Sequence, residues 1–154
     1  MKRLTAVMVI LMLLSGCEKA EPEPVGYTLN IDGVSIGMGM DAEAVVQQLG
    51  GCTPIVSESC GAMGGNDYEY PFPDLTIYAN DGGGFRRIYC VVLESDLIKT
   101  GEDISIGDTV EDVTGVYGEP DEVTSFALTY RKGGMKLVFL IADNTVSSIQ
   151  YLER

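Results

Sequence analysis

The sequence predicts an α+β fold of two tandem units. Each unit is a short helix followed by an antiparallel meander, with the helices packed on one face of the sheet. Residues 38–50 align without a gap on residues 106–118, where six landmark positions agree in kind. Three short apolar runs separated by turn residues follow each segment. The predicted units span residues 27–100, with an insertion at 52–67, and residues 101–154.

Each repeated segment predicts a short helix. Asp41 and Thr109 suit the N-cap, where a side-chain oxygen accepts a hydrogen bond from a backbone N–H. Gly50 and Gly118 suit the far end, because glycine readily takes the left-handed conformation there. With about two turns, neither helix is stable alone in water, so each must pack on another element.

The strands are predicted from alternating apolar residues between turn signals. Lys-Gly-Gly at 132–134 and Asp-Asn at 143–144 predict two tight hairpins in the second unit. The Gly-rich stretch at 80–84 predicts a third connection between strands in the first unit. The predicted strands cover residues 27–31, 68–70, 75–79, 85–93, 125–131, 135–141 and 145–152.

Residues 1–16 have the composition of a secretory signal peptide. Two cations precede an apolar run at 4–14, which is shorter than the roughly 20 residues needed to span a bilayer. The segment Leu-Ser-Gly-Cys at 14–17 resembles the bacterial lipobox, in which the Cys receives a diacylglycerol and becomes the mature N-terminus. The resemblance implies a lipid on Cys17 that anchors the chain to the extracytoplasmic face of the bacterial cell membrane. An ordinary signal peptide is the alternative.

Residues 17–26 predict an acidic tether, because Pro22 and Pro24 hold the backbone extended. Removal of residues 1–16 takes away two basic residues and no acidic residue. The mature chain then has 8 basic and 23 acidic residues, a net charge of −15. Such a surface repels phosphate groups, so neither nucleic acid nor anionic lipid headgroups are expected partners.

The chain contains no histidine, which excludes Ser-His-Asp and Cys-His catalysis and a zinc site with imidazole ligands. The stretch 37–42 fits the letters of a dinucleotide fingerprint, but strands joined by hairpins do not supply the parallel unit that it requires. No calcium-loop motif is present. We therefore predict no enzyme activity, cofactor or metal site. Weak hydrolysis by adjacent carboxylates is the remaining catalytic hypothesis, and the pairs are Glu102-Asp103, Glu111-Asp112 and Asp121-Glu122.

Three cysteines besides the lipidated one belong to the predicted units. An extracytoplasmic location permits a disulfide between two of them. Cys90 alternates with Ile88 and is expected to point into the core as a small apolar residue. The candidate disulfide is therefore Cys52–Cys60, with Cys60–Cys90 and three reduced thiols as the alternatives.

The second unit carries the pattern of a known family. Its matching residues are Gly107, Val113, Gly118, Glu119, Pro120, Tyr130, Leu137, Phe139, Val146 and Ile149. The pattern resembles the small outer-membrane lipoproteins of the β-barrel assembly machine. In tandem it resembles the β-lactamase inhibitor proteins, in which two units form one concave sheet backed by helices. The chain is also similar to duplicated lipoproteins of Gram-positive gut bacteria. This resemblance implies protein binding, either as an inhibitor of an exported or membrane-bound enzyme or as an accessory of an envelope complex.

Strand alternation predicts which face of the sheet binds a partner. The residues expected to face the helices are Leu75, Ile77, Ile88, Leu137, Phe139 and Ile149. The opposite face carries the candidate partner-binding residues Tyr78, Arg87, Tyr89, Lys136 and Gln150, together with Thr76, Val138 and Leu140. Aromatic rings with Arg suit protein recognition. Because Val138 and Leu140 are apolar, the alternative is that the insertion or packing between the two units partly covers this face.

The predicted function is therefore that of a non-enzymatic, membrane-anchored lipoprotein that binds a protein partner. The alternative is a lipoprotein that captures a small ligand or substrate, with the insertion at 52–67 and residues 68–72 forming a pocket lid.

Overall fold

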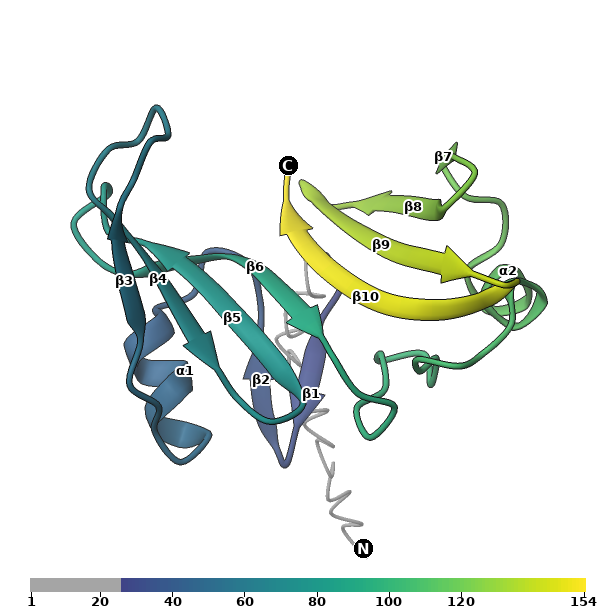
Figure 1. The fold of residues 1–154 in the computed structure, drawn as a ribbon, viewed down its shortest axis with the longest axis horizontal. Coiled ribbons are helices and arrows are strands. Elements are labelled where there is room, and N and C mark those ends of the chain that lie inside the picture. Colours follow the sequence, from purple (N-terminus) through teal and green to yellow (C-terminus); the bar gives the residue numbers. More distant parts are fainter. Residues whose placement is uncertain (1–25) are drawn as a thin grey trace, which may run out of the picture.

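The computed structural model describes residues 26–154. The predicted signal peptide, Cys17 and nearly all of the predicted tether lie outside the described residues. The main element is an antiparallel sheet of eight strands in the order β3-β4-β5-β6-β10-β9-β8-β7 (Figure 1). Its strands are β3 (Ile55–Glu58), β4 (Asn66–Pro71), β5 (Leu75–Asn80), β6 (Arg87–Leu93), β7 (Glu122–Val123), β8 (Ala127–Lys132), β9 (Met135–Ala142) and β10 (Thr145–Glu153).

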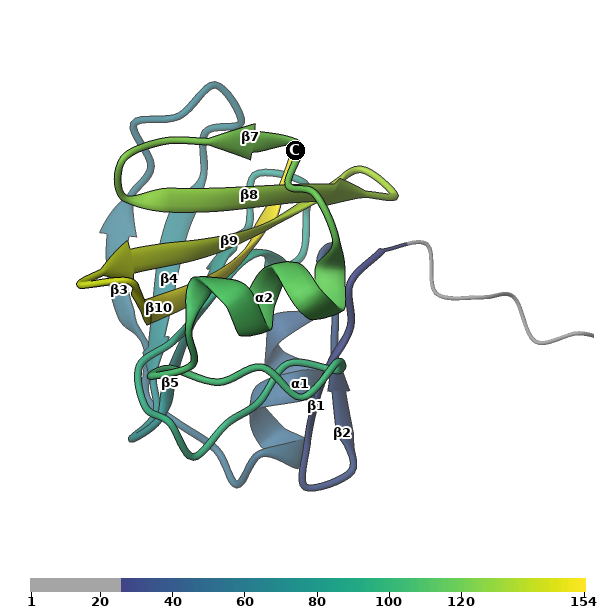
Figure 2. The ribbon, with the colours of Figure 1, turned by 90° about the vertical axis from the view of Figure 1, so that its right-hand side faces the viewer.

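Three smaller elements cover one side of this sheet. They are the two-stranded sheet of β1 (Leu29–Ile31) and β2 (Val34–Ile36), helix α1 (Ala42–Gln48) and helix α2 (Val110–Tyr117). The large sheet is strongly curved, and all three elements lie on its convex side (Figures 1 and 2). The concave side carries no helix among the described residues.

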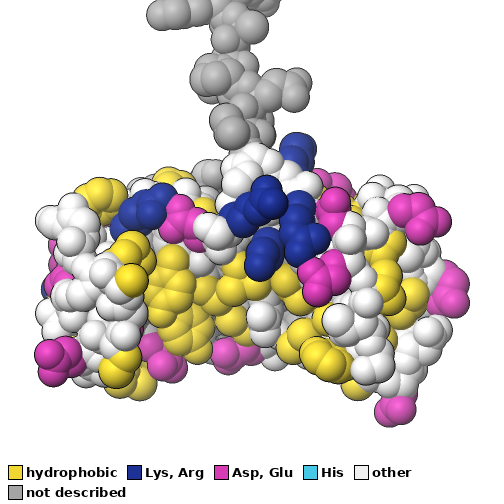
Figure 3. Space-filling model, turned by 90° about the horizontal axis from the view of Figure 1, so that it is seen from above, with side chains coloured by type: hydrophobic (Ala, Val, Ile, Leu, Met, Phe, Trp, Pro, Cys, Tyr) yellow, Lys and Arg dark blue, Asp and Glu magenta, His cyan; other side chains and the backbone are white. Residues whose placement is uncertain are grey.

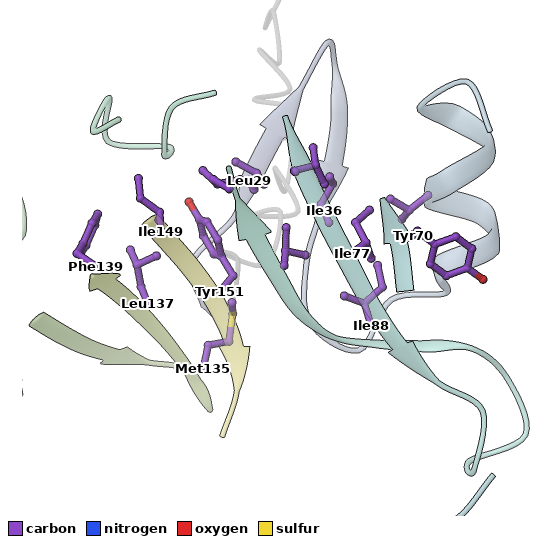
Figure 4. Close-up of a cluster of buried hydrophobic side chains, with 14 of the residues drawn as sticks. Leu29, Ile36, Tyr70, Ile77, Ile88, Met135, Leu137, Phe139, Ile149 and Tyr151 are labelled. Atoms are coloured by element: carbon purple, nitrogen blue, oxygen red, sulfur yellow. The ribbon is translucent and has the colours of Figure 1, made fainter. Parts of the chain in front are cut away.

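The core lies between the convex side of the sheet and these covering elements. Leu29 and Ile36 of the β1–β2 hairpin point toward side chains of the large sheet, including Ile77, Ile88 and Ile149 (Figure 4). All five side chains are buried in one continuous hydrophobic cluster. Because strands from both halves contribute to it, the described chain folds around a single core.

The predicted fold class of two tandem helix-plus-meander units is wrong. Strands make up 43% of the structure and helices 12%. The strands of both halves form one continuous sheet, because β6 pairs with β10 in the middle. Two helices of seven and eight residues are also too short to cover it, and the β1–β2 hairpin covers the central part of its convex side.

Local predictions of helices and turns are confirmed. Asp41 accepts a hydrogen bond from the backbone N–H of Glu43 at the start of α1, and Thr109 forms a capping box with Asp112 at the start of α2. The turn between β9 and β10 places Asp143 and Asn144 at φ 50° and 64°. This left-handed conformation matches the twist of the two strands.

Other sequence predictions need correction. The insertion at 52–67 contains β3 and the beginning of β4, which lengthens the sheet by a strand. The strand predicted at 27–31 is present only over 29–31, and it pairs with β2 outside the large sheet. Residues 68–72 do not form a pocket lid, since 68–71 lie within β4, between β3 and β5.

Candidate functional site: the concave face of the sheet

The concave face is built from alternate residues of neighbouring strands. The register places Tyr78 opposite Glu69 on one side and Cys90 on the other. Cys90 lies opposite Leu152, which lies opposite Lys136. Side chains of paired residues share a face, so these residues form a row across the sheet.

A second row runs beside the first. It contains Thr76, Val92, Gln150, Val138 and Thr129, each paired with the next across a strand boundary. Thr76 is buried and donates a hydrogen bond to Glu94 at 2.9 Å, whereas Gln150 and Val138 are half-buried. The face therefore combines apolar side chains with a few hydrogen-bonding groups.

All five candidate partner-binding residues lie on this face. Tyr78 and Lys136 belong to the first row, Gln150 belongs to the second, and Arg87 lies opposite Asn80 at the beginning of β6. Tyr89 contacts Tyr78, with 6.4 Å between ring centroids and 41° between ring planes. All five side chains are half-buried, so they are accessible from solvent.

A β-bulge between β5 and β6 accounts for the position of Tyr89. Ala79 lies opposite Ile88, but Tyr78 lies opposite Cys90, which leaves Tyr89 as the extra residue. Alternation therefore changes phase between Ile88 and Cys90. Cys90 is buried as predicted, but it lies on the concave face beside Tyr78 rather than in the core.

Burial raises the pKa values of the titratable groups around this bulge. Partial burial is the main cause that raises the pKa of Tyr78 and of Tyr89 above the ordinary value, and nearby carboxylates add to it. Burial raises the pKa of the Cys90 thiol to about 11. Near neutral pH the two phenols are hydrogen-bonding groups on aromatic rings, and Cys90 is an un-ionised thiol.

The two predicted cations on this face differ in their contacts. Arg87 donates from Nη1 to Oε2 of Glu153 at 2.9 Å and from Nη2 to Oε1, so its guanidinium is already paired within the chain. Lys136 forms no ion pair with residues 26–154. Of the two, Lys136 is the one whose charge is available to a partner.

Hydrophobic side chains extend across the middle of the concave face (Figure 3). The rows and their neighbours supply Val92, Val138, Leu140 and Leu152, all half-buried. No element covers them among the described residues; only the loop at 59–65 borders one corner, where Cys60 and Met63 share a hollow of about 310 Å³ with Tyr89. An apolar centre with a polar surround is the usual composition of a protein-binding surface.

Sequence reasoning missed the part of this face formed by β3 and β4. Ile55, which is 60% exposed, lines a hollow of about 230 Å³ with Glu69, Tyr78 and Tyr89. The signal was present in Ile55 and Val56, two adjacent β-branched residues of the kind enriched in strands. Because the segment around them is rich in Gly and Ser, it was interpreted as an insertion without a strand.

The three cysteines within residues 26–154 form no disulfide. Cys52, Cys60 and Cys90 are free thiols, and the Cys52 thiol donates to the carbonyl oxygen of Pro71 at 3.1 Å. The candidate pair Cys52–Cys60 is separated by β3, because the two residues precede and follow this strand. An extended strand rises about 3.3 Å per residue, whereas disulfide-bonded Cα atoms lie roughly 4.4–6.8 Å apart.

The adjacent carboxylates considered for hydrolysis have structural contacts. Asp112 completes the cap of α2, and Glu102 accepts a hydrogen bond from the hydroxyl of Tyr117. Asp121 accepts from the backbone N–H of Arg131 at 2.6 Å. Within residues 26–154, no three acidic or Cys side chains gather closely enough to hold a metal ion.

Another hollow of the described residues lies away from the concave face. It has a volume of about 460 Å³, is open to solvent, and lies between the β1–β2 hairpin, the end of α1 and the β4–β5 turn. Its lining includes Val34, Leu49, Phe72, Asp74 and Leu97.

Neither helix of residues 26–154 has the length and apolarity needed to cross a membrane.

Comparisons with protein families, curated proteins and solved structures found no match to this chain.

Proposed function

We propose that this chain is a lipid-anchored, extracytoplasmic protein-binding module. It binds its partner on the concave face, and Cys17 holds it at the bacterial cell membrane. The single observation that supports the binding role is the uncovered concave face, on which the Tyr78–Tyr89 pair adjoins a half-buried apolar band. Exposed apolar surface of this kind is typical of interaction sites.

The Tyr78–Tyr89 pair is the proposed anchor of the interface. Aromatic side chains contribute disproportionately to binding, because each buries a large area while losing few rotatable bonds. Lys136 and Gln150 supply polar contacts around it, and Arg87 holds the edge of the face in place through Glu153. The lipoprotein resemblance supports two partner classes, an exported or membrane-bound enzyme and a subunit of an envelope complex.

Photo-cross-linking in intact cells tests this proposal. A photoreactive phenylalanine analogue at position 78 is expected to capture one defined protein. The same analogue at Leu97, which is 78% exposed on the other side of the molecule, serves as the matched control. Tyr89→Ala is expected to lower the yield at position 78 by about tenfold, the usual effect of removing an interface anchor.

Two results would contradict the proposal. One is capture of the same proteins at positions 78 and 97. The other is an unchanged yield after Tyr89→Ala in a chain that reaches the membrane in normal amounts.

Capture of a small ligand is the second candidate, supported by the hollow of about 460 Å³ lined by Phe72 and Leu97. Its volume is within the range of small-molecule sites, although it is open rather than enclosed. If this hollow is the binding site, Leu97→Asp abolishes capture of a ligand that native mass spectrometry detects, while Tyr78→Ala leaves it unchanged.

A further inference from the structure

Positive charge is concentrated at one end of the large sheet. Residues 26–154 contain seven Lys and Arg residues against 20 Asp and Glu residues. Arg86 pairs with Glu43 and Lys99 pairs with Asp103. The other five lie where β6 begins, β8 and β10 end and β9 begins, and we call this group the cationic end. It consists of Arg87, Arg131, Lys132, Lys136 and Arg154. Figure 3 shows a group of Lys and Arg side chains at one side of the concave face.

Three members of the cationic end are not neutralised by the described residues. Arg87 pairs with Glu153 and Arg131 pairs with Glu122. The other three, Lys132, Lys136 and Arg154, form no ion pair within residues 26–154. Lys132 and Arg154 are exposed, and the Lys132 ammonium lies 5.9 Å from the centroid of the Tyr27 ring.

The described chain begins at the same end. Gly26 packs against the side chain of Met135, directly beside Lys132 and Lys136. Gly26 and Tyr27 also border a hollow of about 420 Å³ together with Arg87. Nine residue steps separate Gly26 from Cys17, so a lipid on Cys17 holds a bilayer within about 30 Å of the cationic end.

We propose that the cationic end docks on anionic lipid headgroups. The proposal rests on lipid anchoring at Cys17, which brings the bilayer to this end of the molecule. Lys and Arg residues near an anionic surface are attracted over roughly one Debye length, about 10 Å at moderate salt. At this end Glu153 and Glu122 are taken up by Arg87 and Arg131, so the attraction rests on the other three cations, and acidic residues beyond that distance have little effect. The sequence predicted that anionic lipid headgroups would be repelled, because the net charge sums all residues and does not show that cations gather at one end.

Docking in this way orients the binding face. The cationic end lies at one end of the strands, so the strands rise from the membrane and the concave face opens sideways. The Tyr78–Tyr89 pair then faces a partner that stands beside the protein on the same membrane.

Lysine acylation read by mass spectrometry tests the docking with the lipidated mature chain. The chain is placed on vesicles of phosphatidylcholine alone or of phosphatidylcholine with phosphatidylglycerol. On anionic vesicles, acylation of Lys132 is expected to be about fivefold slower, the population shift that a single cation near an anionic surface supplies. Lys99, 53% exposed and remote from this end, is the internal control.

Charge variants identify the group responsible. Lys136→Glu with Arg154→Glu is expected to return the Lys132 rate to its value on neutral vesicles, whereas Lys99→Glu leaves the protection in place. Raised salt is expected to remove the protection. Equal Lys132 rates on the two kinds of vesicle, or equal effects of the two sets of substitutions, would overturn the proposal.

A second arm separates failure of docking from failure of the lipid anchor. The Cys17→Ser chain is held on the same vesicles by an N-terminal hexahistidine and a nickel-chelating lipid. Protection of Lys132 in this arm supports docking even if Cys17 carries no lipid in cells. Loss of protection here, with the chain held at the surface, overturns docking and leaves the anchor proposal standing.

Discussion

Arg87 at the beginning of β6 pairs with Glu153 at the end of β10 through both guanidinium nitrogens. The pair adjoins the central junction of the sheet, where β6 pairs with β10 and joins the two halves of the described chain. A bidentate geometry makes it stronger than a typical surface ion pair, although both side chains are partly exposed.

A double-mutant cycle tests this pair. Arg87→Ala, Glu153→Ala and the double variant are expected to give a coupling free energy of about 0.5–1 kcal/mol in urea unfolding. The exposed pair Lys99–Asp103 is the control, with an expected coupling smaller than that of Arg87–Glu153. Equal coupling in both pairs would show that the bidentate contact adds no stability.

Asp81 predicts a specific dependence of stability on pH. Its carboxylate accepts hydrogen bonds from the backbone N–H of Asn66 at 2.7 Å and from the hydroxyl of Tyr68 at 2.8 Å. These two contacts, the first the larger, hold the pKa of Asp81 below its ordinary value. The stabilisation is present above the unfolded pKa of about 3.9 and is lost as the pH falls through the lower folded-state value.

Unfolding by urea at several pH values measures this effect. Asp81→Asn is expected to flatten the decline of stability in the acidic range, because the titrating group is gone. Asp96→Asn, in the exposed loop after β6, is the matched control and should leave the decline unchanged. If stability falls with pH as steeply in the Asp81→Asn variant as in the wild type, Asp81 is not the group responsible.

Phe139 is the centre of an aromatic cluster in the core. Its ring is fully buried, with centroids 5.3 Å from Tyr117 and 5.9 Å from Tyr130. Phe139→Ala is expected to lower the free energy of unfolding by about 3–5 kcal/mol, since it removes buried area and leaves a cavity. Phe126→Ala, at a ring that is 62% exposed, should cost less than about 0.5 kcal/mol.

Alkylation of the cysteines decides between free thiols and the candidate disulfides. Cys60 is exposed and is expected to react rapidly with iodoacetamide in the native protein. Cys90 is expected to react only on unfolding, because it is buried and its pKa of about 11 leaves little thiolate at neutral pH. Recovery of a disulfide-linked peptide with Cys52 or Cys90, and an unreactive Cys60, would contradict the free-thiol state.

Lipid anchoring is tested at Cys17. The wild-type chain is expected in the membrane fraction and to incorporate a labelled fatty acid, while Cys17→Ser loses both properties. Cys60→Ser serves as the matched cysteine control and should retain them. A Cys17→Ser chain that still incorporates label would remove the basis of the anchor.

The sequence predicted elements whose signals are local. Asp143 and Asn144 form the predicted hairpin because their short polar side chains tolerate the left-handed conformation. Thr109 caps α2 for an equally local reason, a hydrogen bond to its own helix. The pairing of β6 with β10 was not predicted, because no local signal states which distant strand lies beside another.

The sequence predicted the residues of the concave face wherever side chains alternate regularly between the two faces of a strand. Tyr78 and Gln150 lie on the expected face because each strand alternates around them. Alternation fails at Cys90, where the bulge adds one residue and changes the face. Bulges arise from the packing of paired strands, so a single strand's sequence does not show them.

The β6–β10 pairing also governs when this chain finishes folding. β10 is the last of the described strands, and until it has formed β6 has an unpaired edge in the middle of the future sheet. Contacts of such long sequence separation form late. If the chain is exported unfolded through a narrow channel, as the proposed signal peptide requires, nearly its whole length has to emerge before β6 can pair with β10, so the sheet closes on the far side of the membrane.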